Sequence, residues 1–405
     1  MRILLVSEDL PGAQVGGLGK HVVTLGNALL ARGHVVRILG RNDRGADGAA
    51  QIGFRGEFLP GFDCAHPGWK EKQLGVFNPL KRPWFARKIA AAIDRHAAGF
   101  HVVHYHGHLP LVGLYVDPQV NFVQTRHDQG SECLVHLRFR DGEVCTTRAA
   151  RDCSACIGQD AGALRKTVTA LAVDGYRQAS ARAFAARKTV FVSDFLRRQF
   201  LRAVPDADLA RCRVIPNFVD YAALRAAAAD APAPTAGQVA LVGRIDAGKG
   251  FGEFLAAASG RLPPHASIAI AGDGPQRPAL EARFGSPQVR FLGWQAYADA
   301  LALSARSQLC VVPSLCEEAC STTVLEALAL GKPVLALARG GTPELASYQH
   351  YPGQLQLARS MAELAEDLHA ALALPQRQPR PQPLPWHFGA DAAVIVDRLV
   401  DLYAD

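Results

Sequence analysis

The chain has 405 residues and a net charge of +7, and 49% of its residues are hydrophobic. It is long enough for two domains with large cores, and its basic balance favours an anionic partner such as a phosphorylated substrate, a nucleic acid or an acidic membrane. No apolar run is long enough to span a membrane and no signal peptide is recognisable, so we expect a cytoplasmic protein that is at most peripheral on the inner face of the cell membrane.

The first residues predict the opening of a doubly wound sheet. An apolar strand at 2–8 is followed by a glycine-rich loop, a helix and a second strand at 34–42. Gly16 and Gly17 at the helix start would let a ligand approach the backbone closely. The loop completes neither a dinucleotide fingerprint nor a P-loop, so neither of those sites is predicted.

Residues 43–83 are rich in Gly and Pro and are expected to be irregular. The segment 66–95 carries seven Lys or Arg against two acidic residues, and Trp84 and Phe85 lie within it. Such a segment could contact anionic lipid headgroups. The alternative is a solvated loop that leads into a helix at 84–98.

Two further strands are predicted at 101–108 and 120–128, and the first of them ends in histidines. His127 would lie at the carboxyl end of its strand, where open α/β sheets bind ligands. A single histidine is more often structural, but its position and the adjacent Asp128 favour a functional role.

Four of the nine cysteines fall within one 24-residue segment, 133–156, which follows His127. Cys133, Cys145, Cys153 and Cys156 could supply four thiolates to a structural zinc ion. A redox pair at Cys153 and Cys156, or simple loop cysteines, are the alternatives.

The second half of the chain repeats the alternation of strands and helices, after an Ala- and Pro-rich stretch at 221–237 that we interpret as the connection between domains. The segment 243–249, GRIDAGK, lacks the hydroxyl residue of a P-loop, but Arg244 and Lys249 place two cations after a strand, where they can meet a diphosphate. Gly272 and Gly274 form a second tight turn at a strand end.

The segment 314–336 contains Glu318 and Glu326 around a predicted helix start. We expect Glu318 just before the helix and Glu326 about two turns into it. Residues 320–323 would then offer free backbone N–H groups to an anion. The alternative is an ordinary capped helix with two exposed glutamates.

Taken together, these motifs resemble the GT-B glycosyltransferases, specifically the retaining family 4 enzymes, over essentially the whole chain. The resemblance implies an α/β fold with two Rossmann-like doubly wound domains that face a cleft. The acceptor domain would comprise 1–218 and 386–405, with a Cys-rich insertion at 131–158. The nucleotide-sugar donor domain would comprise 219–385.

The resemblance also implies roles for single residues. Arg244 and Lys249 match the family's diphosphate-binding cations, Glu326 matches the glutamate that holds the ribose, and Glu318 matches the one beside the reacting sugar carbon. His127 matches the histidine near the sugar. The remaining predicted donor contacts are Gly16, Gly17, Gly243, Gly272, Gly274, Cys320, Ser321, Thr322 and Thr323.

Two departures from the family pattern affect the predicted sugar pocket. Ala319-Cys320-Ser321 replaces a Gly-aromatic-Gly, and Phe218 replaces a glycine after Asn217.

The resemblance implies transfer of a sugar from a UDP-linked donor to a hydroxyl of a glycan or glycolipid, in cell-surface polysaccharide or lipopolysaccharide synthesis. We expect a front-face mechanism that needs no metal or other catalytic cofactor, and we regard Asp206-Ala207-Asp208 as unrelated to a metal site. A nucleotide-sugar epimerase on the same fold is one alternative. A basic nucleic-acid-binding protein is another, although we expect no nucleic-acid partner.

Overall fold

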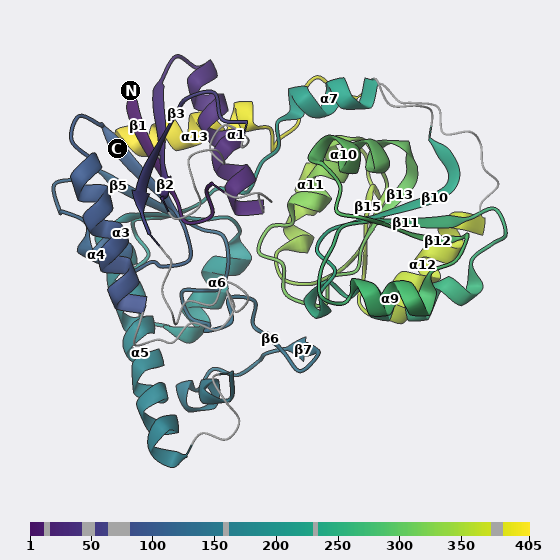
Figure 1. Cartoon of the computed structure of the whole chain (residues 1–405), viewed down its shortest axis with the longest axis horizontal. Helices are drawn as coiled ribbons and strands as arrows, with labels where there is room; N and C mark the ends of the chain where they lie inside the picture. Colours follow the sequence, from purple (N-terminus) through teal and green to yellow (C-terminus); the bar gives the residue numbers. More distant parts are fainter. Residues whose placement is uncertain (12–16, 43–52, 64–81, 157–161, 230–233, 374–383) are drawn as a thin grey trace. The chain divides into compact units, whose positions relative to one another are not determined.

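The computed structural model describes the whole chain except residues 12–16, 43–52, 64–81, 157–161, 230–233 and 374–383. The chain forms two compact units. The first contains residues 1–140, 145–217 and 392–405, and the second contains residues 141–144 and 218–391. The last helix of the chain therefore belongs to the first unit (Figure 1).

The first unit is built on a seven-stranded sheet in the order β3-β2-β1-β4-β5-β8-β9, in which all neighbouring strands are parallel. The strands are β1 (Arg2–Ser7), β2 (Val35–Arg41), β3 (Glu57–Phe62), β4 (Val102–His106), β5 (Phe122–Arg126), β8 (Lys188–Phe191) and β9 (Cys212–Val214). The helices are α1 (Gly17–Ala31), α3 (Arg82–His96), α4 (Val112–Tyr115), α5 (Ala163–Ala186), α6 (Asp194–Ala203) and α13 (Ala392–Ala404).

Alternate residues of β1 pack against opposite layers of helices. Leu4 and Val6 belong to the same buried cluster as Phe85 and Ile89 of α3. Leu5 points the other way, toward α1, which also lies against α13. Burial on both faces explains why β1, β4 and β5 are almost continuously buried.

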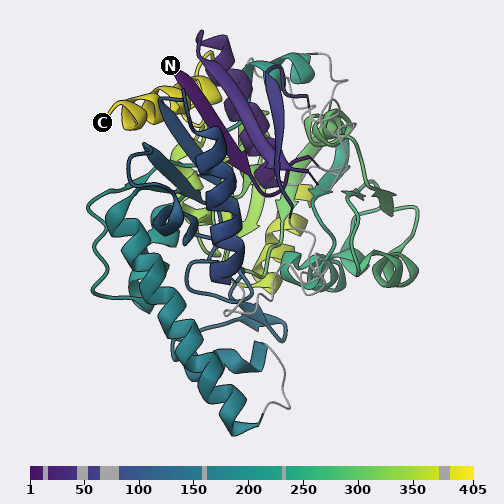
Figure 2. The ribbon, with the colours of Figure 1, turned by 60° about the vertical axis from the view of Figure 1, so that its left-hand side comes forward.

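Helix α5 extends well beyond the sheet, as two views of the molecule show (Figures 1 and 2). The 3-10 helix η2 (Ala150–Cys156) packs against it. The two-stranded sheet of β6 (Phe139–Arg140) and β7 (Glu143–Val144) precedes η2 in the chain. Among the described helices, none combines the length and the apolar character needed to cross a membrane.

The prediction that residues 43–83 are irregular is wrong for β3 and for the start of α3. Pro60 lies within β3 but cannot donate a ladder hydrogen bond. It is tolerated because β3 is the edge strand of its sheet.

The second unit contains a six-stranded parallel sheet in the order β12-β11-β10-β13-β14-β15. The strands are β10 (Thr235–Val242), β11 (Ser267–Ala271), β12 (Val289–Gly293), β13 (Ser307–Val312), β14 (Val334–Leu337) and β15 (Leu355–Ala358). The helices are α7 (Tyr221–Ala229), α8 (Phe251–Ala258), α9 (Arg277–Phe284), α10 (Tyr297–Arg306), α11 (Thr322–Ala329) and α12 (Met361–Ala373), with the 3-10 helices η3 (Ala247–Lys249), η4 (Ser259–Arg261) and η5 (Thr342–Tyr348). The predicted α/β class with two Rossmann-like doubly wound domains is confirmed.

The strand order of each sheet reverses at one point, between β1 and β4 in the first unit and between β10 and β13 in the second. Ligands of open α/β sheets bind outside the carboxyl ends of the strands at such a point. The segments that follow these four strands are therefore where a site is expected.

The interpretation of residues 221–237 as a connection between domains is wrong for α7 and for the start of β10. Alanine has the highest helix propensity, so an Ala-rich stretch folds as a helix when apolar residues anchor it. Tyr221 and Leu224 are buried, and the Tyr221 hydroxyl donates a hydrogen bond to the Pro385 carbonyl at 2.8 Å.

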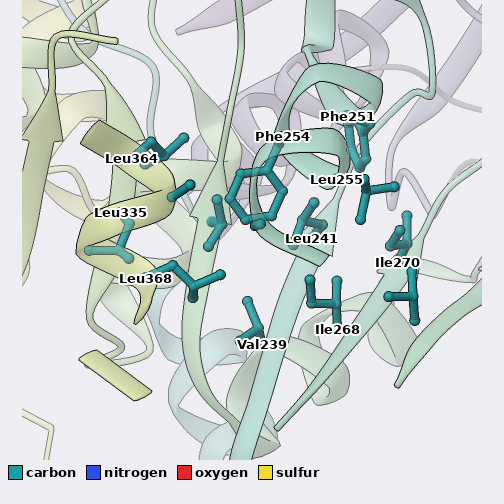
Figure 3. Close-up of a cluster of buried hydrophobic side chains, with 14 of the residues drawn as sticks. Val239, Leu241, Phe251, Phe254, Leu255, Ile268, Ile270, Leu335, Leu364 and Leu368 are labelled. Atoms are coloured by element: carbon teal, nitrogen blue, oxygen red, sulfur yellow. The ribbon is translucent and has the colours of Figure 1, made fainter. Parts of the chain in front are cut away.

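The core of the second unit lies between its sheet and the helices α8 and α12 (Figure 3). Phe254 and Leu255 of α8 and Leu368 of α12 are fully buried there, with Leu241 of β10 and Ile268 of β11 from the sheet. This packing fixes the strand ends from which the site loops begin.

Replacing Phe254 by alanine removes a fully buried ring and leaves a cavity, so we expect the free energy of unfolding to fall by about 3–5 kcal/mol. Urea unfolding of the purified protein measures this change. The matched control is Trp386→Ala, since Trp386 is 81% exposed and contacts Arg225 only as a surface cation–π pair. It should change stability by no more than about 1 kcal/mol.

Candidate active site

The loop after β10 is held in a fixed shape by its own side chains and by its glycines. Asp246 caps η3, because its Oδ1 accepts a hydrogen bond from the Gly248 N–H at 3.0 Å. Gly250 has a positive φ of 68°, and a Cβ there would lie 2.2 Å from the Pro313 carbonyl oxygen. Only glycine permits this close approach between the loop and the end of β13.

The same loop is hydrogen-bonded to the segment before α11. The Leu315 and Cys316 N–H groups both donate to the Gly248 carbonyl at 2.9 Å. This contact brings Lys249 to Glu318, and the Lys249 Nζ donates to Glu318 Oε1 at 2.6 Å. The sequence placed these two residues in separate motifs, and the structure joins them.

Glu318 is stabilised as a carboxylate. Burial acts to raise its pKa, but the Lys249 ammonium and the hydrogen bonds from Lys249 and Ser314 outweigh it and hold the pKa below its usual value. Burial likewise acts to lower the pKa of Lys249, and the Glu318 carboxylate raises it instead. The pair therefore carries one positive and one negative charge at neutral pH.

Arg244 is the second predicted cation of this loop. Its side chain is 63% exposed, and its Nε donates to Asp246 Oδ2 at 2.5 Å. Its positive charge also contributes to lowering the pKa of Glu318. Arg244 and Lys249 thus lie on one loop, near one carboxylate.

Helix α11 begins at Thr322, with Ser321 as its N-cap. The Ser321 Oγ accepts a hydrogen bond from the Val324 N–H, and Cys320 before it is buried. The predicted helix start at 320–323 is therefore confirmed. Thr322 and Thr323 occupy its first turn, where backbone N–H groups have no partner within the helix.

Glu326 is the fifth residue of α11, so it lies little more than one turn into the helix and not two as expected. It is only 9% exposed, and one of its oxygens accepts a hydrogen bond from the Tyr297 hydroxyl at 3.1 Å. The alternative of an exposed surface glutamate is wrong for this residue. Tyr297 has no motif in the sequence that could have identified it as a partner.

The predicted donor-binding glycines have a structural reason as well. Gly272 has a φ of 150°, and a Cβ there would lie 1.8 Å from the Gly243 carbonyl oxygen. A Cβ at Gly274 would lie 2.3 Å from the Ile245 carbonyl oxygen. These glycines let the segment after β11 pack directly on the loop after β10.

In the first unit, His127 directly follows β5, as predicted. Gly17 is the first residue of α1, and a Cβ there would meet no atom within 4 Å. Gly16 lies outside the described residues.

His127 is part of a group of four packed histidines that come from separate segments of the chain. The rings of His21 and His127 are 4.6 Å apart, those of His21 and His106 are 5.3 Å apart, and those of His104 and His106 are 4.0 Å apart. Burial lowers the pKa of His21 and of His104 to about 3 and the pKa values of His106 and His127 well below their usual range, so all four rings are neutral. The alternation of histidines in β4 was the available signal, but His21 comes from a distant helix.

Asp128, the residue after His127, organises a second group. The His108 Nδ1 and the His136 Nδ1 lie 2.5 and 3.3 Å from Asp128 Oδ2. Burial acts to lower the pKa of His108, but Asp128 and its hydrogen bond raise it to about 9. Asp128 therefore forms a half-buried ion pair with His108 and does not orient His127.

All four predicted zinc ligands line one cavity, beside α5 and η2. Cys133, Cys145, Cys153 and Cys156 are half-buried and form no disulfide. In the described part of the chain, the groups of three metal-ligating side chains with ligand atoms within 4.8 Å of one another are His21–His106–His127 and His108–Asp128–His136. The thiols therefore share a cavity without converging to ligand distance.

The described part of the basic segment 66–95 begins at Arg82, and this residue is not available to a membrane. Arg82 is 1% exposed, and its guanidinium donates to the carbonyls of Gly130 and Leu134 and lies 4.5 Å from the Tyr176 ring centroid. The contribution expected from Arg82 to a lipid-facing patch is thus wrong. Residues 66–81 lie outside the described residues, and Trp84 is 46% exposed.

Comparison with known proteins agrees with this architecture. The family described as "Glycosyltransferase Family 4" matches residues 15–223, and the family described as "Glycosyl transferases group 1" matches residues 236–373. A glycogen synthase of Mycobacterium tuberculosis (strain CDC 1551 / Oshkosh) is 28% identical over 404 residues, which cover 94% of this chain and 89% of that protein.

Two solved structures illustrate the similarity of the fold. Sucrose-phosphate synthase from Thermosynechococcus elongatus superposes with a TM-score of 0.64 at 20% identity, over 100% of this chain and 98% of that one. Anabaena Alr3699/HepE in complex with UDP-glucose superposes with a TM-score of 0.60 at 18% identity, over 100% of this chain and 97% of that one. The match to glycosyltransferase family 4 over residues 15–223 alone covers more than half of the chain. The protein therefore belongs to glycosyltransferase family 4 and is a group 1 glycosyltransferase with the GT-B fold.

Proposed function

We propose that the protein transfers a sugar, with retention of anomeric configuration, from a UDP-linked donor to a hydroxyl group of a glycan or glycolipid. The observation that carries this proposal is the ion pair between Lys249 and Glu318 beside the start of α11. The similarity to a protein that binds UDP-glucose supports the choice of donor. Synthesis of a cell-surface polysaccharide or lipopolysaccharide is the proposed setting, and it rests on the family resemblance and the basic charge.

The residues after β10 and β13 suit a diphosphate leaving group. Arg244 offers a planar fork, Lys249 offers a point charge, and the first turn of α11 offers backbone N–H groups. These donors are held in place before the reaction by the loop contacts described above. Preorganised charges of this kind stabilise the negative charge that develops as the bond to the diphosphate breaks.

Glu318 and Glu326 would hold the two ends of the donor. Glu318 lies beside the cation and is proposed to contact the sugar near the reacting carbon. Glu326 is one helical turn further from the N-terminus of α11 and is proposed to hold the ribose hydroxyls, with Tyr297 orienting its carboxylate. Because Gly243, Gly272 and Gly274 have no side chains, the nucleotide could lie close to the backbone at these positions.

The reaction needs no covalent protein intermediate in this proposal. The acceptor hydroxyl attacks the anomeric carbon on the face that the diphosphate leaves, and the departing phosphate oxygen takes the acceptor proton. Glu318 stays paired with Lys249 and serves as a positioning group and not as a nucleophile. His127, on the first unit, is proposed to contact the sugar. No catalytic metal is required, and membership of the glycosyltransferase family favours transfer over the epimerase alternative.

The four cysteines are proposed to hold a structural zinc ion that ties η2 to α5. Four thiolates around Zn²⁺ carry a net negative charge, and Arg138, Arg140 and Arg177 line the same cavity and would compensate it. The sulphur atoms would have to move closer together on binding, as is common when metal binding and local folding are coupled.

Lys249→Ala should reduce turnover by roughly 10²–10³-fold, because one charge-stabilising group is lost from the leaving-group site. The measurement is sugar transfer and UDP release with UDP-sugars and a chelator present. Arg290→Ala, which removes an exposed cation from β12, is the control and should keep normal turnover. Near-normal turnover in Lys249→Ala would remove this residue from the site, and no release of UDP by the unmodified protein would contradict the proposed function.

Glu326→Ala should raise the KM for the donor and change kcat much less, since the ribose contact is made equally in the ground and transition states. Tyr297→Phe should produce a smaller change in the same direction, because it removes only the hydroxyl that orients Glu326. The exposed Glu366→Ala on α12 is the matched control. Steady-state kinetics with varied donor measures both constants, and an unchanged KM in Glu326→Ala would contradict the ribose role.

If the four cysteines hold zinc, the purified protein should contain about one equivalent that is lost in Cys153→Ser and kept in Cys212→Ser, since Cys212 does not line the cavity. Elemental analysis after dialysis against a mild chelator measures the content. Less than about half an equivalent argues against a four-thiolate site, and a Cys153–Cys156 disulfide detected without reductant would support the redox alternative.

A further inference from the structure

Three histidines converge at the point in the first sheet where the strand order reverses. His21 comes from the first turns of α1, His106 ends β4, and His127 follows β5. One ring nitrogen from each lies within 4.8 Å of the other two. This convergence lies within a single unit, so it depends on one sheet and one helix alone.

The spacing of the nitrogens fits a transition-metal ion. His106 Nδ1 and His127 Nε2 are 3.1 Å apart. Two nitrogens bound to one tetrahedral zinc ion at about 2.0–2.1 Å would be separated by about 3.3 Å. Little rearrangement is therefore needed for these two rings to share an ion.

The surroundings of His106 do not satisfy the hydrogen-bonding capacity of both its ring nitrogens. Its side chain is fully buried, and its Nε2 has no hydrogen-bond partner among the described residues. A buried polar atom without a partner costs free energy, and such an atom calls for a ligand or another explanation. Rotation of the His106 ring would exchange the two nitrogens and direct either of them at an ion.

A fourth histidine, His104, packs against the His106 ring and is not itself a candidate metal ligand. His104 packs on the His106 ring, with the centroids 4.0 Å apart. Its Nδ1 is hydrogen-bonded to the Tyr403 hydroxyl at 2.6 Å and its Nε2 to the Thr125 hydroxyl at 2.7 Å. Both nitrogens of His104 are therefore used, and the ring restricts where His106 can point.

The neighbouring group of His108, Asp128 and His136 needs no ion to explain it. His108 and Asp128 form a close ion pair, and Arg126 lies 3.8 Å from the same carboxylate. The Arg126 charge, which would oppose a nearby metal ion, is thereby partly neutralised.

We propose that His21, His106 and His127 form a binding site for a late first-row divalent transition ion such as Zn²⁺ or Co²⁺. Three neutral imidazoles suit such ions, whereas Mg²⁺ and Ca²⁺ prefer oxygen ligands and would not bind. His127 is partly exposed, so an ion could reach the three nitrogens from the side of this residue. If His127 also contacts the sugar, as the proposed function has it, an ion held here would inhibit transfer, and this consequence alone rests on that function.

The test is a titration of the full-length Cys133→Ser, Cys153→Ser double variant with Co²⁺, followed by visible absorption. The two substitutions remove half of the thiols that could compete for the ion. An imidazole site should then give the absorption bands of four-coordinate cobalt without thiolate-to-cobalt charge transfer. Binding should saturate at one equivalent, and excess Mg²⁺ should not displace the ion. Wild-type protein provides a second measurement, since Zn²⁺ should raise its Tm while Mg²⁺ does not.

His21→Ala and His127→Ala, each added to this background, should weaken Co²⁺ binding by at least about tenfold, because each removes one of three protein ligands. His96→Ala on α3 is the matched control and should bind as the background does. Circular dichroism shows whether each variant is folded, and His106→Gln replaces the fully buried ring without a large cavity. Absence of the cobalt bands in the folded background protein, or unchanged affinity in His21→Ala and His127→Ala, would overturn the site.

Discussion

The ion pair between Lys249 and Glu318 is the contact on which the candidate site of the second unit depends. Its two members are 69 residues apart in the chain, and they meet because β10 and β13 are neighbours in the second sheet. A charge that is taken out of water is stable only when it is paired. The pairing therefore fixes two loops at once, and it leaves a cation and a helix N-terminus at the same strand ends.

The close approach of neighbouring backbone segments is the second constraint. It accounts for the glycines in the loops after β10 and β11 without any contact to a ligand. Gly250, Gly272 and Gly274 lie where a Cβ would overlap a neighbouring carbonyl group. The loops after β10, β11 and β13 consequently form one continuous layer of backbone.

Different side chains lie at the point where the strand order of the first sheet reverses. Neutral histidines gather at the ends of β4 and β5, and a separate, half-buried ion pair between His108 and Asp128 lies beside them. The cations Arg244 and Lys249 thus follow a strand of the second sheet, whereas imidazole nitrogens gather at the strand ends of the first. This difference matches the division between donor and acceptor units that the family resemblance implies.

The sequence by itself determined the class of fold, since apolar strands alternating with amphipathic helices have few other solutions. It also placed Arg244, Lys249, Glu318 and the start of α11 at strand ends, because those positions depend only on local order. It failed where an outcome depended on distant neighbours. Pro60 sits in a strand because that strand is at an edge, and α7 is a helix because Tyr221 and Leu224 find a buried surface.

Only the tertiary structure decided which residues act together. Tyr297 reaches Glu326 from another helix, His21 joins His106 and His127 across the first sheet, and Arg82 turns inward to buried carbonyls. Spacing along the chain carries no information about such contacts, because parallel strands pair residues as distant as Val239 and Leu309, or Ile3 and Val102. The sequence shows which functional groups each segment carries. The order of strands in each sheet decides which of these segments lie side by side.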